Sequence, residues 1–241
     1  MLKLYYTEAA FPGTAPQTLL SCLSPGRREI VLRRAVRDRT TAALAELLLR
    51  YALMRSPYTS NTDAEILWDG KPRFADPGLG LSFNLSHVGA GRSGENSAGY
   101  AAVVLSDEGP CGVDIELPRG IRNREALTRK LFCDAELEYL AQREPEAFFD
   151  IWCAKEAFVK YTGEGFSRPL STVLTDPTTG TAMSSDGAVR CALKVFRERG
   201  LTLCAAAEVI PASLAAEYVC AEDVLRACQA GHAENSLCSA E

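Results

Sequence analysis

Two acidic residues alternate along residues 112–116, whose sequence is GVDIE. On a β-strand, alternate side chains share a face, so Asp114 and Glu116 would lie side by side with Cα atoms roughly 6.6 Å apart. Two carboxylates on one face repel each other unless a cation lies between them, and hard oxygen ligands suit Mg²⁺. The pattern is also typical of a half-buried strand with a solvated outer face, so it does not identify a metal site by itself.

A second cluster of polar residues lies at residues 152–160, WCAKEAFVK. Trp152, Glu156 and Lys160 recur every four residues and would form one stripe of a helix, with Lys155 beside it and apolar residues on the opposite side. The acid could complete a metal site, and the lysines could neutralise phosphate oxygens. The alternative is an ordinary surface pair of glutamate and lysine.

A third candidate is the segment at residues 83–87, FNLSH. As a strand, it would place Asn84 and Ser86 on one face, and His87 would end the strand at the start of a loop. Such a histidine could contact a phosphate or could simply cap or pack. A nearby excess of positive charge could hold a small polyanion; it comprises Arg27, Arg28, Arg33, Arg34, Arg37 and Arg39.

The sequence GAGRSG at residues 89–94 matches the glycine pattern of a dinucleotide-binding turn. That turn requires a strand before it and a helix beginning at its last glycine. Here the residues that follow are ENSAG and then a strand-like YAAVVL, so we expect no dinucleotide site.

The elements that must position these residues mix the two kinds of secondary structure. We expect helices at residues 25–54, 124–142, 146–161 and 221–229, and strands at residues 1–6, 81–85, 100–105, 111–117, 173–174, 188–196 and 201–209. This order predicts an α+β fold with two halves, residues 1–109 and 110–230, joined near Gly109. Residues 231–241 are expected to form a disordered tail.

Composition limits the classes of function. The 241 residues carry a net charge of −5, which gives no overall sign of nucleic-acid binding. We expect no membrane segment and no signal peptide, hence a cytoplasmic protein. Nine cysteines, an odd number without a C-x-x-C pair, favour reduced thiols, and the spacing of Cys228, His232 and Cys238 fits no usual zinc site.

Taken in order, these segments resemble those of the 4'-phosphopantetheinyl transferases, in particular the monomeric two-half class that serves peptide and polyketide synthetases (the surfactin-synthetase-activating type). The resemblance covers about residues 25–224. The matching segments are GKP at residues 70–72, FNLSH at 83–87, GVDIE at 112–116, WCAKEAFVK at 152–160, GEG at 163–165 and SRPL at 167–170. The loop at residues 88–99 is longer and richer in glycine than this family pattern.

The resemblance implies a fold of two similar α+β halves that form a pseudo-dimer, and a monomeric protein. It implies transfer of the 4'-phosphopantetheine arm of coenzyme A to a serine of an apo acyl or peptidyl carrier protein, with release of adenosine 3',5'-bisphosphate. Mg²⁺ would be held by Asp114, Glu116 and Glu156. Glu156, or Glu116 through a water, would take the proton of the serine, and Lys160 would stabilise charge on the phosphates.

The resemblance also implies a set of coenzyme A contacts. Lys155 and Lys160 would bind phosphates, Lys71 and Pro72 would border the adenine, and Ser86 and His87 would contact phosphates. His87 would lie near the 3'-phosphate, with Arg27 or Arg28, and Arg39, completing that pocket. The same residues would also serve a Mg²⁺-dependent hydrolase of coenzyme A or of nucleotide diphosphates, and a coenzyme A-binding module without catalysis is a third reading.

Overall fold

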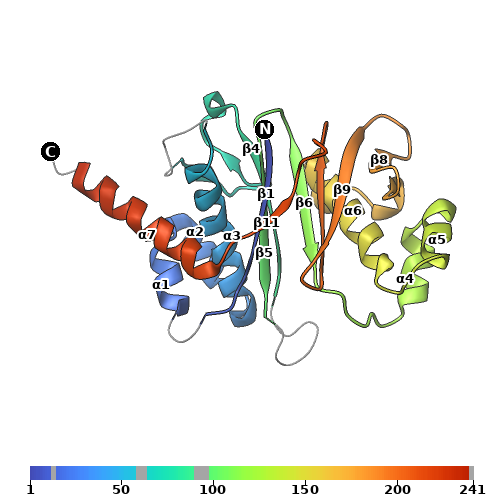
Figure 1. The fold of residues 1–241 in the computed structure, drawn as a ribbon, viewed down its shortest axis with the longest axis horizontal. Helices are drawn as coiled ribbons and strands as arrows, with labels where there is room; N and C mark the ends of the chain where they lie inside the picture. Colours follow the sequence, from blue (N-terminus) through green and yellow to red (C-terminus); the bar gives the residue numbers. More distant parts are fainter. Residues whose placement is uncertain (12–14, 58–63, 90–97, 239–241) are drawn as a thin grey trace.

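The computed structural model describes residues 1–11, 15–57, 64–89 and 98–238. Figure 1 shows four layers, with α1–α3 on one side, α4–α6 on the other and two β-sheets between them. The expected α+β class is confirmed. None of the described helices is long and apolar enough to cross a membrane. The glycine-rich segment at residues 90–97, including most of the GAGRSG motif, lies outside the described residues, so the absence of a dinucleotide site there stays a prediction.

The first sheet has the strand order β11-β1-β5-β4. Its members are β1 (Leu2–Glu8), β4 (Ser82–Val88), β5 (Tyr100–Ser106) and β11 (Ala216–Tyr218), and the small ribbon of β2 (Ile66–Leu67) and β3 (Arg73–Phe74) lies beside it. The helices of this half are α1 (Ala15–Ser21), α2 (Pro25–Leu32) and α3 (Val36–Met54). The leucines of α3 form the buried core against this sheet.

The single helix expected at residues 25–54 is broken between α2 and α3. The side chain of Arg39 folds back over this break, and its guanidinium donates to the carbonyl oxygens of Leu32 and Arg34 at 2.8 and 3.1 Å. These bonds satisfy carbonyls at the end of α2 that have no partner within the helix. The break places Arg34 on an exposed turn between the two helices.

The second sheet has the order β6-β10-β9-β8-β7. Its strands are β6 (Cys111–Glu116), β7 (Val173–Asp176), β8 (Thr181–Ser184), β9 (Arg190–Glu198) and β10 (Leu201–Ala207). The helices of this half are α4 (Arg124–Leu131), α5 (Asp134–Ala141) and α6 (Ala147–Thr162). Short 3₁₀ turns, η1 (Pro77–Leu79), η2 (Gly165–Ser167) and η3 (Leu170–Thr172), lie in the connections.

The two halves share a connectivity. In the first, the chain passes through β1, α3, β4 and β5, and the antiparallel strand order is β1-β5-β4. In the second, it passes through β6, α6, β9 and β10, and the antiparallel order is β6-β10-β9. This correspondence supports the expectation of two similar halves.

The two sheets share one apolar core. Leu4 and Val104 of the first sheet pack with Val113, Ile115 and Leu203 of the second. The division after Gly109 stays a prediction, but residues beyond 214 return to the first half: β11 pairs with β1, and Val224 at the start of α7 (Ala221–Cys238) is buried in its core. Helix α7 continues to Cys238, through most of the segment expected to be disordered, and residues 239–241 lie outside the described range.

Strand β6 and helix α6 approach each other most closely at Gly112. A Cβ atom there would lie 2.1 Å from the carbonyl oxygen of Ala157 and 2.6 Å from the backbone nitrogen of Tyr161. Only glycine fits between these two elements without displacing one of them.

We predict that Gly112→Ala moves α6 away from β6 and lowers the free energy of unfolding by about 1–3 kcal/mol, as overpacking does elsewhere. Thermal unfolding would measure this loss. Gly26→Ala is the matched control, since a Cβ at Gly26 in α2 would meet nothing within 4 Å. Equal melting temperatures for the two variants would contradict the close-packing argument.

Candidate functional site at the junction of β4, β6 and α6

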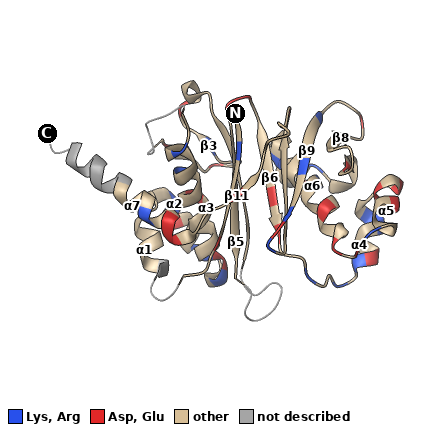
Figure 2. Ribbon diagram, in the orientation of Figure 1, with Lys and Arg blue, Asp and Glu red and all other residues tan. Residues whose placement is uncertain are grey.

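The alternation along β6 places its acidic residues opposite the shared core. Val113 and Ile115 are buried between the two sheets, so the alternating Asp114 and Glu116 lie on the opposite face of β6, against which α6 packs. Figure 2 shows acidic residues in red on both β6 and α6. Asp114 is 6 % exposed, so this face is not the solvated outer face of a simple amphipathic strand. A buried carboxylate requires compensation by hydrogen bonds or charge.

Asp114 obtains that compensation from two other elements. Its Oδ1 accepts hydrogen bonds from Ser86 Oγ on β4 at 2.8 Å and from Lys160 Nζ on α6 at 2.7 Å. Lys160 also donates to Ser86 Oγ at 2.8 Å and to the carbonyl oxygen of Val113 at 3.0 Å. The neighbouring Asn84 Oδ1 accepts from the backbone nitrogen of Val113 at 3.1 Å, which fixes β4 against β6.

The second oxygen of this carboxylate, Asp114 Oδ2, is buried and has no hydrogen-bond partner in the described part of the chain. The thiol of Cys153 lies close enough for Asp114 to raise its pKa, after the larger effect of burial. That thiol, however, donates to the carbonyl oxygen of Thr202 at 3.6 Å. A buried carboxylate oxygen without a donor is uncommon in native proteins and calls for an explanation such as an unseen ion.

Glu156 and Glu116 complete a group of three carboxylates. Burial raises the pKa of Glu156, and the negative charges of Asp114 and Glu116 raise it further, while Lys160 opposes them. Glu116 forms an ion pair with Arg119, in which Oε2 of Glu116 lies 2.7 Å from a guanidinium nitrogen of Arg119. Asp114 and Glu116 are thus close enough to Glu156 for their charges to raise its pKa, and Lys160 and Arg119 pair with two of the three carboxylates.

These residues fit a hard divalent cation by their chemistry. Within the described residues, no group of three or more His, Cys, Asp or Glu has the geometry of an assembled metal site. The candidate ligands are nevertheless all carboxylate oxygens, which Mg²⁺ prefers. One of them, Asp114 Oδ2, accepts no hydrogen bond from the described residues. The assignment of Mg²⁺ to these residues remains a proposal.

Lys155 does not join this group, so the expected phosphate contact has no support in the geometry. Its side chain is fully buried, and its Nζ forms a 2.9 Å ion pair with the fully buried Glu136 of α5. The same Nζ also donates to the carbonyl oxygens of Leu170 and Val173. Successive helix residues differ by about 100° in direction, so Lys155 points away from the face that carries Glu156 and Lys160.

His87 lies at the end of β4, as expected, with Arg34 beside it. The Nε2 of His87 and a guanidinium nitrogen of Arg34 are 3.2 Å apart. Burial and the charge of Arg34 lower the pKa of His87 to about 4. Lys160 and Arg27 act in the same direction, so a neutral imidazole lies among three cations, an arrangement that favours an anion.

The other arginines expected in this pocket use their guanidinium groups in contacts with the backbone or with an aromatic ring. Arg39 binds the carbonyls at the end of α2, and Arg28 donates to the carbonyl oxygens of Leu20, Ser21 and Leu23. Arg27 is 5 % exposed, donates to the carbonyl oxygen of Ala42 at 2.9 Å and lies 4.0 Å from the ring centre of Trp68. Arg34 was counted in the arginine-rich stretch of the sequence but was not singled out for this pocket, because the break between α2 and α3 was not foreseen.

Lys71 and Pro72 line a cavity of about 640 Å³ together with Phe74, Phe83 and Cys111. The Nζ of Lys71 donates to the carbonyl oxygens of Lys160 and Tyr161 in the last turn of α6. A cation at this end of a helix is favourable because the last carbonyls lack helical partners. The loop that carries Lys71 is thereby tied to the helix that carries Glu156 and Lys160.

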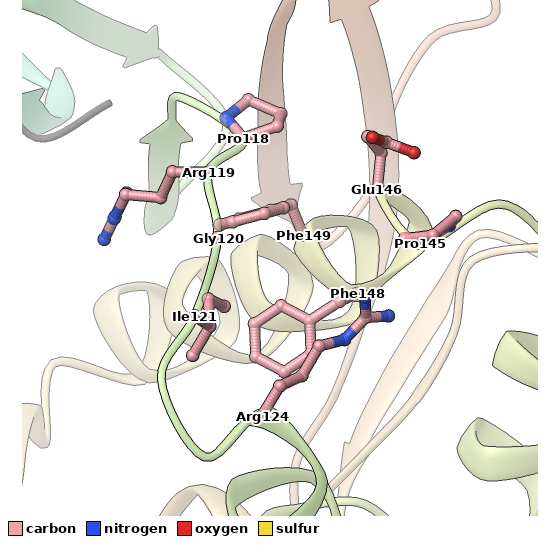
Figure 3. A pocket seen from close by; sticks show the side chains of 9 residues that line it. All are labelled: Pro118, Arg119, Gly120, Ile121, Arg124, Pro145, Glu146, Phe148 and Phe149. Carbon is pink, nitrogen blue, oxygen red and sulfur yellow. The ribbon is translucent and has the colours of Figure 1, made fainter. Parts of the chain in front are cut away.

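Two further cavities, of about 410 and 250 Å³, lie on the other side of Glu116. Ile121, Phe148 and Phe149 line both cavities (Figure 3). Trp152 lines the smaller one and stacks on Phe148 at 5.9 Å between ring centres. This apolar neighbourhood explains why a tryptophan shares the polar stripe of α6.

Comparison with known proteins agrees with this geometry. The model of the 4'-phosphopantetheinyl transferase superfamily matches residues 110–221, which include β6, α6 and the three carboxylates. Residues 110–221, a little under half of the chain, are thus similar to this superfamily.

Curated relatives carry the same description. The 4'-phosphopantetheinyl transferase AcpT of Escherichia coli K12 is 37 % identical over 147 residues, which are 58 % of this chain and 66 % of that protein. HetI of Nostoc sp. is 33 % identical over 107 residues, 41 % of this chain and 40 % of HetI. Sfp of Bacillus subtilis is 25 % identical over 178 residues, 70 % and 74 % of the two chains. The chain thus spans less than two thirds of the length of the first two.

The positions of the two lysines of α6 generate a prediction about stability. Lys155→Met would leave Glu136 buried without its cation, which costs about 3–5 kcal/mol in comparable buried pairs. Lys160→Met should cost clearly less, because the side chain of Lys160 is 26 % exposed and Ser86 still donates to Asp114. Thermal unfolding of the two variants measures the difference. A smaller loss for Lys155→Met would contradict the structural role assigned to it.

Proposed function

We propose that this protein transfers the 4'-phosphopantetheine arm of coenzyme A to a serine hydroxyl of an apo acyl or peptidyl carrier protein, with Mg²⁺, and releases adenosine 3',5'-bisphosphate. The observation that carries the proposal is the convergence of Asp114, Glu116 and Glu156, with a buried carboxylate oxygen that lacks a donor. The superfamily match over these same residues supports it. We also propose that the protein acts as a monomer, since one chain supplies every residue of this site.

Coenzyme A binding falls to residues of both halves. The cavity at Lys71 and Pro72 has the volume for an adenine ring and apolar walls that suit one. The charges of Arg34 and Lys160 around His87 suit the 3'-phosphate and the neighbouring pyrophosphate. We therefore assign the 3'-phosphate to His87 and Arg34, in place of Arg39.

The carboxylates would hold Mg²⁺, which when bound neutralises phosphate oxygens and stabilises charge as the phosphate bond breaks. Lys160, anchored on Asp114 and Ser86, is fixed where it can also pair with those oxygens. Glu156 suits the role of base, since its raised pKa makes it a better proton acceptor for the serine Oγ than an ordinary carboxylate. Glu116, acting through a water, is the alternative base.

The test of this function is the mass of an apo-carrier protein after incubation with the enzyme, coenzyme A and Mg²⁺. The carrier should gain the mass of one phosphopantetheine, and adenosine 3',5'-bisphosphate should form only when the carrier is present. Equal formation of that product without the carrier would identify a hydrolase instead. A panel of acyl and peptidyl carriers would identify the acceptor class, including whether it belongs to the synthetases that Sfp-type enzymes serve.

Removal of the metal-site carboxylate should abolish transfer. We predict that Asp114→Ala reduces kcat/KM for the carrier to background, since the remaining carboxylates no longer hold the cation, and that EDTA does so reversibly. Asp223→Ala, which removes an exposed aspartate paired with Arg226 on α7, is the control and should retain full activity. Full transfer by Asp114→Ala, or in excess EDTA, would refute the metal assignment.

Recognition of the 3'-phosphate should be separable from the chemical step. His87→Ala and Arg34→Ala should each lower kcat/KM for coenzyme A by about one to two orders of magnitude, because a charge-assisted hydrogen bond to phosphate contributes roughly 1.5–3 kcal/mol. Both should affect dephospho-coenzyme A much less. The matched control is Arg33→Ala. Arg33 is the residue before Arg34, and its exposed side chain pairs with Glu29.

The titration of His87 provides a second readout of the same site. Its pKa of about 4 lies below the usual 6.5, so the ring is neutral at pH 7 in the free protein. A bound phosphate dianion should raise that pKa, because it offsets the charge of Arg34. NMR titration should show this rise with coenzyme A and not with dephospho-coenzyme A. Equal responses to the two ligands would place the 3'-phosphate elsewhere.

A further inference from the structure

Arg119 forms an ion pair with Glu116, one of the three carboxylates expected to hold the cation. Its NH1 nitrogen lies 2.7 Å from Glu116 Oε2 and 3.2 Å from the carbonyl oxygen of Leu117. The side chains of Arg119 and Glu116 are 24 % and 15 % exposed, so the pair lies at the edge of the site and not deep within it. Both residues are on the segment that leaves β6, three positions apart.

This ion pair and a cation on Glu116 weaken each other electrostatically. A guanidinium and a divalent cation on one carboxylate would repel strongly at contact distance, and each would reduce the negative charge available to the other. The pair also lies at the partly exposed edge of the site, where ion pairs are weaker than they are in a protein interior.

Arg119 also has an aromatic contact beside the cavities, apart from Glu116. Its side chain lines both cavities beside Glu116, and its guanidinium carbon lies 5.9 Å from the ring centre of Phe149. Figure 3 shows Arg119 on a chain segment that passes along the cavity through Gly120. The guanidinium already lies over the Phe149 ring, so a rotation of the side chain alone would take the charge off the carboxylate while it keeps this aromatic contact, where cations bind favourably.

We propose that Arg119 is a displaceable counter-ion of Glu116. In the metal-free protein it neutralises Glu116 and limits the repulsion among the three carboxylates, and cation binding displaces it toward the cavity lined by Phe149. This inference rests on the proposed function, since it takes Glu116 to be a cation ligand. Arg119 is a positioning residue in this scheme, and it makes no contact with the substrate.

The proposal gives two effects of opposite sign. Removing Arg119 leaves the carboxylates less compensated, so the metal-free protein should unfold at a lower temperature. The same change removes the competitor of the cation, so cation affinity should rise. An arginine that merely supports the fold would lower both quantities.

The test measures binding of Mn²⁺ by the loss of its free EPR signal, in saturating coenzyme A without any carrier, so that no transfer is involved. Arg119→Gln should bind Mn²⁺ roughly threefold to tenfold more tightly than wild type, as expected for a partly exposed ion pair. Its melting temperature in EDTA should fall below that of wild type. Arg129→Gln, which removes an exposed arginine paired with Glu125 at 3.1 Å, should leave both quantities unchanged.

Asp114→Ala separates failure of the metal site from failure of this proposal. If wild type binds Mn²⁺ no better than Asp114→Ala, the metal site itself is refuted and Arg119 loses its role with it. If Asp114→Ala abolishes binding but Arg119→Gln binds Mn²⁺ equally or more weakly than wild type, only the counter-ion proposal is overturned. Arg119→Lys, which keeps the charge on a more flexible side chain, should show the same changes in smaller measure and covers the case that Arg119→Gln does not fold.

Discussion

The carboxylate of Asp114 is buried, with one oxygen accepting two hydrogen bonds and the other accepting none from the residues that the structure describes. Such a group is unfavourable in a protein interior unless surrounding elements supply hydrogen bonds and positive charge. Here β4 supplies Ser86 and α6 supplies Lys160, so the carboxylate holds one strand from each half and one helix at a single point. Gly112, two residues before Asp114 on β6, has no side chain and therefore lets α6 lie close enough for these contacts.

Much of this arrangement could be predicted from the sequence, because it depends on local periodicity. Alternation along a strand is enough to place Asp114 and Glu116 on one face, and spacing along a helix is enough to place Glu156 and Lys160 on one stripe. The role of Lys155 could not be predicted in this way. Its orientation is decided by Glu136, which belongs to another helix and to no recognisable motif.

The arginines show the same limit. Arg39 was expected at the phosphate, but the broken helix gives its guanidinium two backbone carbonyls, and the same break places Arg34 beside His87. A helix break between two helical stretches leaves little trace in the pattern of apolar residues. The apolar cavities near Trp152 also depend on contacts between distant segments, which periodicity does not report.

Under the proposed function, the three carboxylates form an arrangement that favours a cation at the expense of the metal-free fold. Lys160 and Arg119 reduce the repulsion, yet the pKa of Glu156 is still raised by burial and by its acidic neighbours. Destabilised groups of this kind are typical of functional sites, where the missing partner is supplied on binding.

The most direct test of this account is the thermal stability of Glu156→Gln, with and without Mg²⁺ and coenzyme A. The neutral amide removes one of three converging charges, so the account predicts a higher melting temperature than wild type in EDTA. It also predicts that Mg²⁺ with coenzyme A raises the melting temperature of wild type and not that of Glu156→Gln. A lower melting temperature for Glu156→Gln in EDTA, or an equal response to Mg²⁺ in both proteins, would contradict it.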